Sequence, residues 1–319
     1  MFSLIHFIIR LSSQLLTKNK LSILIYHQVL SEPDPMRATE PTTDIFRWQM
    51  KLINRYFVPI SLSEAVVRLA NDTLPANAIC VTFDDGYLDN LENAAPILKE
   101  FDIPATVYVA TAFSHGKNMF NDRVIDLIGN QNHQKFHLEI IGLGEVKVTD
   151  VASRNLLVKK IISKVKYQPY KQRQAVIDEL YRLNNADESP GKMMIPEQIK
   201  ALSDLGIEIG AHTVDHPILK VLPEQEQFKQ LVNSKQTLEK WLNKSVSNFA
   251  YPNGRLHEDY SEKTVELVKS AGFNSAVSTH HGISDKETDI YQLKRFTPWD
   301  KTPLRFHIRL LLNALSRVN

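Results

Sequence analysis

The sequence predicts an α/β protein whose parallel strands close into a (β/α) barrel, with a helical insertion. Strand-like and helix-like segments alternate over most of the 319 residues, which is typical of parallel strands joined by right-handed crossovers. The number of such units favours a barrel over an open sheet. The alternation stops over residues 117–195, which are rich in Lys, Gln and Asn. We interpret this stretch as a mostly helical insertion between two barrel units.

The expected strands are short, apolar and rich in β-branched or aromatic residues. In chain order they cover residues 21–26, 79–83, 105–110, 207–211, 247–251 and 274–279. The expected helices cover residues 61–70, 87–101, 224–243 and 259–271. The first of these opens with Ser61-x-x-Glu64, a capping box. The second stops before Pro104, because the residue before a proline disfavours the helical conformation.

The composition is that of an ordinary soluble globular protein, with 43% hydrophobic and 23% charged residues. The net charge of +2 argues against bulk nucleic-acid binding. The single cysteine, Cys80, lies inside the apolar run of residues 78–81. A disulfide framework is therefore excluded, and Cys80 is expected to be a small core residue.

Both ends of the chain are apolar and basic. Residues 1–20 contain three basic residues, residues 301–319 contain four, and neither segment contains an acidic one. The first segment is too short to span a membrane and lacks the features of a cleavable signal. We therefore expect a protein of the cytoplasm or of the inner membrane face. The last segment predicts an amphipathic helix that packs on its own domain or lies on a membrane surface. Its apolar face would hold Leu304, Ile308, Leu311, Leu312 and Leu315.

Polar residues gather where the expected strands end, and in a parallel α/β fold these loops build the active site. They are Asp84 and Asp85, His212 and His216, the Tyr251-Pro252-Asn253-Gly254 segment, and His27. Two carboxylates and three imidazoles at one rim are a set of side chains typical of a metal-dependent hydrolase.

Two adjacent carboxylates repel each other, so their pKa values are driven apart. A divalent cation resolves this conflict by binding one of them, while the other stays free to accept a proton. Catalytic zinc takes three protein ligands and keeps a position for water, and one aspartate with His212 and His216 satisfies that count. Because Pro217 follows His216, we expect a turn-like loop here and not a helix.

Each of these signals has a structural explanation when it is taken alone. An Asp-Asp-Gly after a strand is also a turn and a helix N-cap. A His-x-x-x-His is also two unrelated polar residues, Tyr-Pro-Asn-Gly is a good turn, and His27 is equally a satisfied or surface histidine. Their joint position at the strand ends of one alternating fold favours a catalytic site.

Two segments resemble the leading motifs of the polysaccharide deacetylases, the NodB homology domain of carbohydrate esterase family 4. Residues 82–86, Thr-Phe-Asp-Asp-Gly, are similar to the first motif, and residues 212–217, His-Thr-Val-Asp-His-Pro, are similar to the second. The resemblance covers most of residues 21–300. It implies a distorted (β/α) barrel of the NodB type and Asp84 as general base. It also implies a divalent metal, for which we expect zinc, with the ligands Asp85, His212 and His216.

The segment Leu24-Ile25-Tyr26-His27 resembles the start of the exopolysaccharide deacetylase branch, to which the poly-N-acetylglucosamine enzymes belong. In that branch the histidine of the last motif stands at the front. The resemblance therefore implies that His27 is the general acid.

The third family motif, Arg-x-Pro-Tyr, is altered, because Ala250 stands at the arginine position and Asn253 at the tyrosine position. We expect Arg295 to orient the base in place of the missing arginine. We expect Tyr251 and a backbone N–H near Asn253 to bind the substrate or the oxyanion. The remaining candidate is Trp299, which lines the sugar site or belongs to the core.

The resulting hypothesis is a metal-dependent hydrolase that removes N-acetyl groups from an N-acetylated polysaccharide or oligosaccharide, in exopolysaccharide biosynthesis. Its catalytic domain would cover residues 21–300, between the segment 1–20 and the helix 301–319. The expected partners are the glycan and, through the basic ends, a membrane surface. Two alternatives are a non-catalytic glycan-binding barrel and an amidase of the same fold that acts on small amides. The complete set of two aspartates and two histidines weighs against both.

Overall fold

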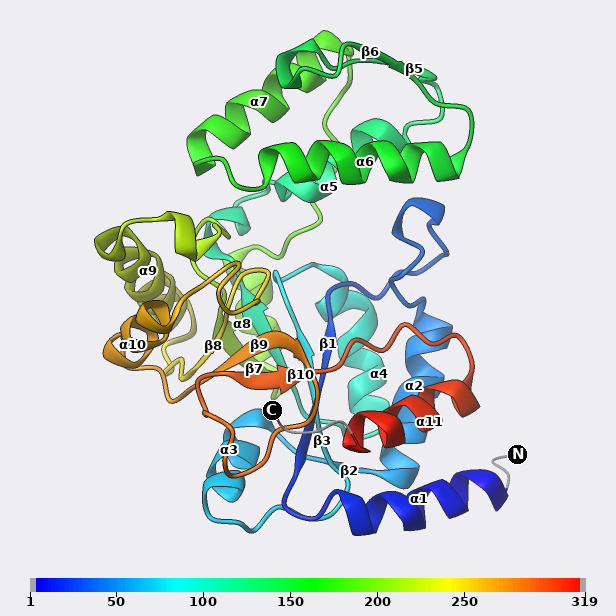
Figure 1. Ribbon diagram of the computed structural model, residues 1–319, viewed down its shortest axis with the longest axis vertical. Helices are drawn as coiled ribbons and strands as arrows, with labels where there is room; N and C mark the ends of the chain where they lie inside the picture. The colour runs from blue at the N-terminus through cyan, green and yellow to red at the C-terminus, as the bar shows by residue number, and fades with distance from the viewer. Residues whose placement is uncertain (1–3, 316–319) are drawn as a thin grey trace.

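The computed structural model describes residues 4–315, and the side chains of residues 5–314. Parallel strands follow one another around a nearly closed sheet (Figure 1). In spatial order they are β1 (Leu21–Tyr26), β3 (Ala78–Phe83), β4 (Ala105–Val109), β7 (Glu208–Ala211), β8 (Asn248–Ala250), β9 (Ser275–His281) and β10 (Leu293–Arg295), with the short β2 (Val58–Pro59) beside β3. The two ends of the sheet meet, because the Ile25 N–H donates to the Phe296 carbonyl at 3.0 Å and the Phe296 N–H donates to the Ile23 carbonyl at 2.8 Å. The predicted (β/α) barrel is confirmed.

The register of the strands brings their carboxyl ends to one rim. Tyr26 pairs with Phe83, Phe83 pairs with Val107, and Val109 pairs with Ala211. Strands β1 and β3 are buried along their whole length, as expected of strands covered on both faces. The residues that follow β1, β3 and β7 therefore lie close together.

Helices surround the sheet, and the predicted ones lie where the sequence places them to within a few residues. The predicted helices are α3 (Leu62–Ala70), α4 (Ala95–Glu100), α9 (Glu224–Leu242) and α10 (Glu262–Ser270). Two more, α2 (Thr43–Tyr56) and α8 (Pro196–Asp204), have no counterpart in the prediction. The stretch 87–101 differs from the prediction, because α4 is preceded by a π-helix over Asn90–Ala94. The Leu88 N–H donates to the Lys192 carbonyl at 2.7 Å, so the chain before this helix is paired with the end of the insertion.

The insertion has its own apolar core and lies beyond the carboxyl ends of the strands (Figure 1). Its helices are α5 (Phe120–Gly129), α6 (Val151–Val165) and α7 (Tyr170–Leu183). It also contains an antiparallel pair, β5 (Lys135–His137) with β6 (Glu145–Lys147), that the sequence did not predict. Strands of three residues are too short to give a periodic signal.

The terminal helices α1 (Leu4–Leu16) and α11 (Pro303–Leu315) pack on each other and on α2 at the lower right of Figure 1. Helix α11 buries Phe306, His307, Leu310 and Ala314. Of the two alternatives for its predicted apolar face, packing on the barrel is not observed. The face is turned outward, with Leu304, Ile308 and Leu312 exposed and Leu311 half-buried, while the Leu315 side chain lies outside the described residues. Within residues 4–315, no helix is long and apolar enough to cross a membrane.

Candidate metal and catalytic site

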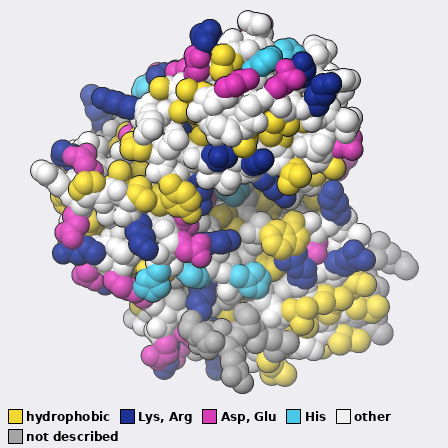
Figure 2. Space-filling model, turned by 45° about the horizontal axis from the view of Figure 1, so that its top comes forward, with side chains coloured by type: hydrophobic (Ala, Val, Ile, Leu, Met, Phe, Trp, Pro, Cys, Tyr) yellow, Lys and Arg dark blue, Asp and Glu magenta, His cyan; other side chains and the backbone are white. Residues whose placement is uncertain are grey.

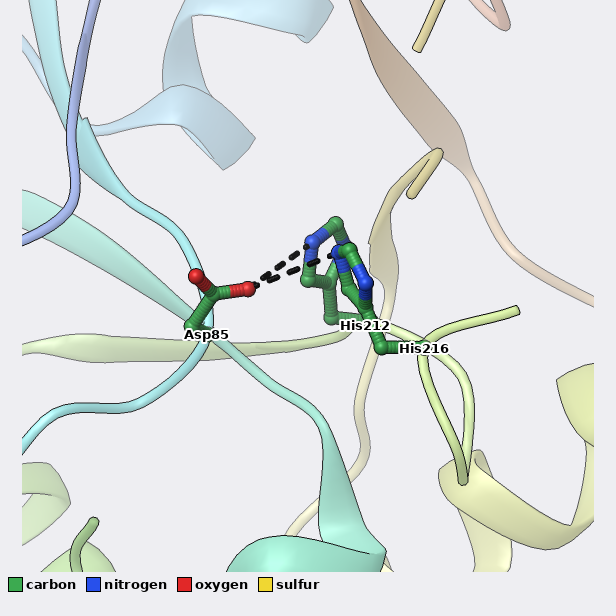
Figure 3. Close-up of side chains that lie close together, drawn as sticks. All are labelled: Asp85, His212 and His216. Carbon is green, nitrogen blue, oxygen red and sulfur yellow. Dashed lines mark ion pairs between the residues drawn. The ribbon is translucent and has the colours of Figure 1, made fainter. Parts of the chain in front are cut away.

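Three side chains that could hold a metal converge at the rim of the barrel (Figure 3). Asp85 follows β3, whereas His212 and His216 follow β7. The Nε2 atoms of His212 and His216 lie 3.5 and 3.6 Å from the same oxygen, Asp85 Oδ1. Asp85 and His212 are buried, and only 13% of the His216 side chain is exposed.

The hydrogen bonds of this cluster fit a bound cation. The His212 Nδ1 lies 2.7 Å from the Ala250 carbonyl, which only accepts, so Nδ1 carries the proton. The lone pair on His212 Nε2 therefore points at Asp85 Oδ1, which has no hydrogen-bond partner within the described part of the chain. Two electron pairs that face each other in a buried site repel, and a metal ion between them removes that repulsion.

Burial sets the protonation of these ligands when no cation is bound. It raises the pKa of Asp85 to about 7, because the carboxylate has lost its water. It lowers the pKa of His212 and of His216, so both imidazoles stay neutral. Neutral imidazole is the form that binds a metal.

The loop after β7 holds an unusual backbone conformation. Thr213 has φ 67° and His216 has φ 49°, both in the left-handed region. This region costs a non-glycine residue on the order of 1–3 kcal/mol, and it is least favourable for a β-branched one. The predicted turn-like loop is confirmed, and its bend returns His216 to within reach of His212, with ring centroids 4.8 Å apart.

Asp84 points to a different partner from Asp85. Arg295 in β10 donates from Nη1 to Asp84 Oδ1 at 2.7 Å and from Nη2 to Asp84 Oδ2 at 2.8 Å. Both side chains are buried. Burial favours the neutral carboxyl, but Arg295 and then His212 outweigh it and lower the pKa of Asp84 to about 2. The two neighbouring carboxyl groups therefore have different pKa values, since Asp84 is paired with the Arg295 guanidinium and Asp85 faces the two histidines.

His27 follows β1 at the same rim. Burial opposes its protonation, but the carboxylates of Asp85, Glu40 and Asp84 outweigh this effect and raise the pKa of His27. The Asn90 side chain donates to the His27 carbonyl at 2.9 Å and fixes this loop against the helix that follows β3. A histidine that is readily protonated suits a proton donor.

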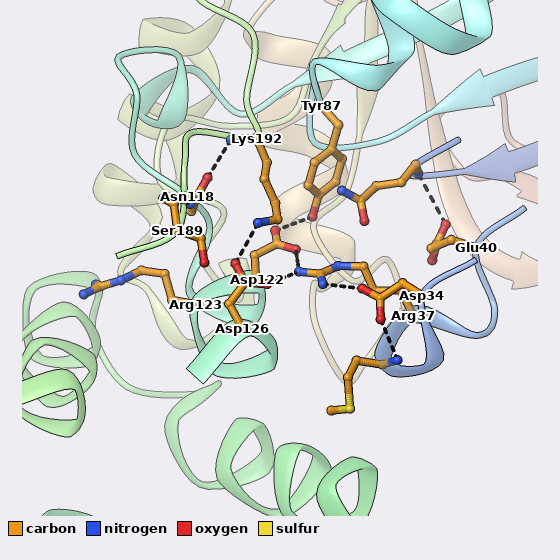
Figure 4. Close-up of polar contacts among 12 residues, drawn as sticks. Asp34, Arg37, Glu40, Tyr87, Asn118, Asp122, Arg123, Asp126, Ser189 and Lys192 are labelled. Atoms are coloured by element: carbon orange, nitrogen blue, oxygen red, sulfur yellow. Dashed lines mark hydrogen bonds and ion pairs between the residues drawn. The ribbon is translucent and has the colours of Figure 1, made fainter. Parts of the chain in front are cut away.

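A cavity of about 240 Å³ opens beside His27, and the insertion forms part of its wall. Figure 4 shows the contacts that join the barrel and the insertion at this cavity. Arg37, from the loop after β1, donates to Asp122 of α5 at 2.9 Å. The Tyr87 hydroxyl donates to the other oxygen of Asp122 at 2.7 Å. Since Asp122 lies in the insertion, no pattern in the sequence connects it with the catalytic rim.

Of the three remaining candidates, Tyr251 lies differently from the expectation, whereas the roles of Asn253 and of Trp299 at the sugar site stay predictions. The Tyr251 side chain is fully buried, and its ring stacks on Tyr260 at 3.9 Å, so it belongs to the core instead of the substrate site. Asn253 adopts φ 59° in the turn after β8, where its carbonyl accepts from Thr279 Oγ1 at 2.5 Å. Trp299 is 55% exposed, and the Arg309 guanidinium of α11 lies 4.7 Å from its ring centroid.

Gln230 of α9 holds the loop that carries His216, and the sequence did not single it out. Its Oε1 accepts from the Val214 N–H at 2.9 Å and the Asp215 N–H at 3.0 Å, and its Nε2 donates to Asp215 Oδ2 at 2.9 Å. A glutamine in a polar-faced helix carries no sequence signal for such a role.

Gln230→Leu is expected to weaken metal binding by about 10–100-fold, the usual effect of removing a group that orients a ligand. The substitution removes all three hydrogen bonds between Gln230 and the loop, but it leaves the candidate metal ligands unchanged. Titration calorimetry with Zn²⁺ measures the change. Gln236→Leu makes the same substitution at an exposed position of α9 and should bind as the wild type does. Equal affinity of the two variants would contradict the role of Gln230.

Comparisons with known proteins find similarity to one family. The family model described as polysaccharide deacetylase matches residues 71–276. The Bacillus subtilis protein YxkH, whose description places it among the polysaccharide deacetylases, is 24% identical over 278 residues, which cover 86% of this chain and 70% of YxkH.

Solved structures show the same fold. The Streptococcus pyogenes deacetylase PplD, in complex with acetate, has a TM-score of 0.60 and 21% identity, and the match covers 92% of this chain and 98% of PplD. IcaB from Ammonifex degensii has a TM-score of 0.58 and 19% identity, over 93% of this chain and 98% of that one.

Proposed function

The chain belongs to the polysaccharide deacetylase family and is a deacetylase hydrolase, and on that premise we propose that it removes N-acetyl groups from an exopolysaccharide, with zinc at the Asp85–His212–His216 site. The observation that carries the metal dependence is the lone pair of His212 directed at the unbonded Asp85 oxygen. The substrate class rests on the resemblance of residues 24–27 to the exopolysaccharide branch.

The chemistry of the proposal is the hydrolysis of an acetamide. A divalent cation at this site would supply Lewis acidity, which polarises a carbonyl and lowers the pKa of water. Asp84 accepts the proton of the attacking water as the new C–O bond forms at the acetyl carbon. His27 donates a proton to the amide nitrogen as the C–N bond breaks. Acetate and a free sugar amine are the products.

Two further features support this division of roles. Arg295 fixes both oxygens of Asp84, so the base is held in one orientation and stays ionised. The cavity beside His27 is lined by polar groups, among them Glu40 and Asn121, that suit the hydroxyls of a sugar.

The direct test is acetate release from poly-N-acetylglucosamine fragments and from chito-oligomers by the zinc-loaded protein. We expect release from the first substrate to exceed release from the second, and chelation to abolish both. Acetate release that survives complete chelation would contradict the metal dependence. The absence of release from any N-acetylated glycan would contradict the substrate class.

A further inference from the structure

Helix α1 exposes an apolar face although it is packed against the barrel on its other side. Its buried side holds His6, Ile9 and Ser13. Its outer side carries five large apolar side chains with exposed fractions of 48–88%, namely Ile5, Phe7, Ile8, Leu11 and Leu15. No charged residue lies among these five positions along the outer face. A face of this kind is unfavourable in water and fits an apolar environment.

Helix α11 continues this surface. Leu304, Ile308 and Leu312 recur every four residues on its outer side, with 38%, 38% and 56% of each side chain exposed. The two helices are joined on their inner sides, where His6 and His307 lie 2.8 Å apart between their Nδ1 atoms. Figure 2 shows hydrophobic side chains gathered at the lower right, where these helices lie. We name the eight exposed side chains of α1 and α11 the terminal apolar surface.

The two segments that carry the terminal apolar surface are basic. Residues 1–20 and 301–319 hold seven of the 38 basic residues and none of the 36 acidic ones, so the rest of the chain has a net charge of −5. Across the part of the chain that is described, five of these side chains form no ion pair: Arg10, Lys18, Lys20, Lys301 and Arg305. The neighbouring acid, Asp300, is already paired with Arg309 at 2.8 Å.

We propose that the terminal apolar surface lies on an anionic lipid bilayer, with α1 and α11 parallel to the membrane plane. An apolar helical face flanked by Lys and Arg matches the boundary between acyl chains and anionic headgroups. A second copy of the chain fits this surface poorly, because two sets of unpaired basic side chains would then face each other. Helix α1 lies at the end of the barrel away from the insertion, so a bilayer there would leave the catalytic rim open (Figure 1).

The test is sedimentation with vesicles of phosphatidylcholine alone and of phosphatidylcholine mixed with phosphatidylglycerol. The full-length protein should bind the anionic vesicles, and high salt should weaken the binding. The triple variant Ile8→Gln, Leu15→Gln, Leu312→Gln should bind at least about tenfold more weakly, because three apolar side chains no longer enter the bilayer. The charge variant Lys18→Glu, Arg305→Glu should also bind more weakly.

The matched control is Val67→Gln, Leu156→Gln, Leu205→Gln, whose side chains are 60%, 68% and 55% exposed on other faces of the molecule. This control should bind vesicles as the wild type does, and all variants should keep the wild-type melting temperature. The proposal is wrong if the wild type does not bind anionic vesicles, or if the first triple variant and the control bind these vesicles equally. A wild-type dimer that this triple variant dissociates, without vesicle binding, would assign the surface to self-association and overturn the proposal.

Discussion

Replacing Asp84 with asparagine is expected to lower the rate of acetate release by about 10²–10⁴-fold, the usual contribution of a general base. The amide cannot accept the proton of the attacking water. The proposed metal ligands Asp85, His212 and His216 stay in place, so elemental analysis should find as much bound metal as in the wild type. Loss of turnover with retention of metal distinguishes a base from a ligand.

Asp84→Asn also leaves Arg295 without its carboxylate, because the two side chains form a buried bidentate pair. Breaking such a pair on one side costs about 3–5 kcal/mol of folding stability. The double variant Asp84→Asn, Arg295→Gln removes both charges and separates the two effects. We expect it to recover stability in thermal melts but not activity. Recovery of activity would mean that the unpaired Arg295, and not the missing base, caused the loss of acetate release.

A nearby carboxyl gives the matched control for this experiment. Burial raises the pKa of Asp89 to about 8, so at neutral pH this side chain is largely protonated. Asp89→Asn therefore replaces one neutral group by another of the same shape. It should keep most of the wild-type rate, and a loss as large as that of Asp84→Asn would show that the assay responds to any change near the rim.

The barrel could be predicted because its signal is spread along the chain. Apolar segments such as residues 21–26 and 79–83 are buried over their whole length, so each one is recognisable without its neighbours. The position of the catalytic rim can also be predicted from these strands, since parallel strands place their carboxyl ends together. Asp84, Asp85 and His212 stand directly after strands, and this position alone brings them into one site.

Other parts of the site depend on contacts between distant segments and leave no local pattern. Gln230 reaches the loop of His216 from the middle of a polar-faced helix, and Asp122 meets Arg37 across 85 positions of sequence. Tyr251 was expected at the substrate because it belongs to a motif, but its ring stacks on Tyr260 in the core. For α11 the sequence leaves open whether the predicted apolar face packs on the barrel or lies on a membrane surface. Both of its faces are partly apolar, and periodicity cannot say which of them meets the barrel.

Replacing His212 with alanine is expected to remove the bound metal and, with it, acetate release. His212 is the most constrained of the three candidate ligands, because its ring is buried and its Nδ1–H donates to the Ala250 carbonyl. The loss of an orienting partner alone typically lowers metal affinity by about 10–100-fold. The loss of a ligand itself should exceed that range. Elemental analysis after gel filtration should find close to one zinc per wild-type chain and almost none in the variant.

His281→Ala supplies the control, since His281 lies at the exposed end of β9 and is not part of the cluster. This variant should keep both metal and activity. Asp85→Ala should behave as His212→Ala does, because Asp85 Oδ1 is the atom that both histidines face. If His212→Ala and Asp85→Ala both retained a full complement of zinc while His281→Ala lost it, the metal would lie elsewhere. The facing lone pairs of His212 and Asp85 would then need another source of stabilisation, such as a proton on the carboxyl group, whose pKa of about 7 permits it.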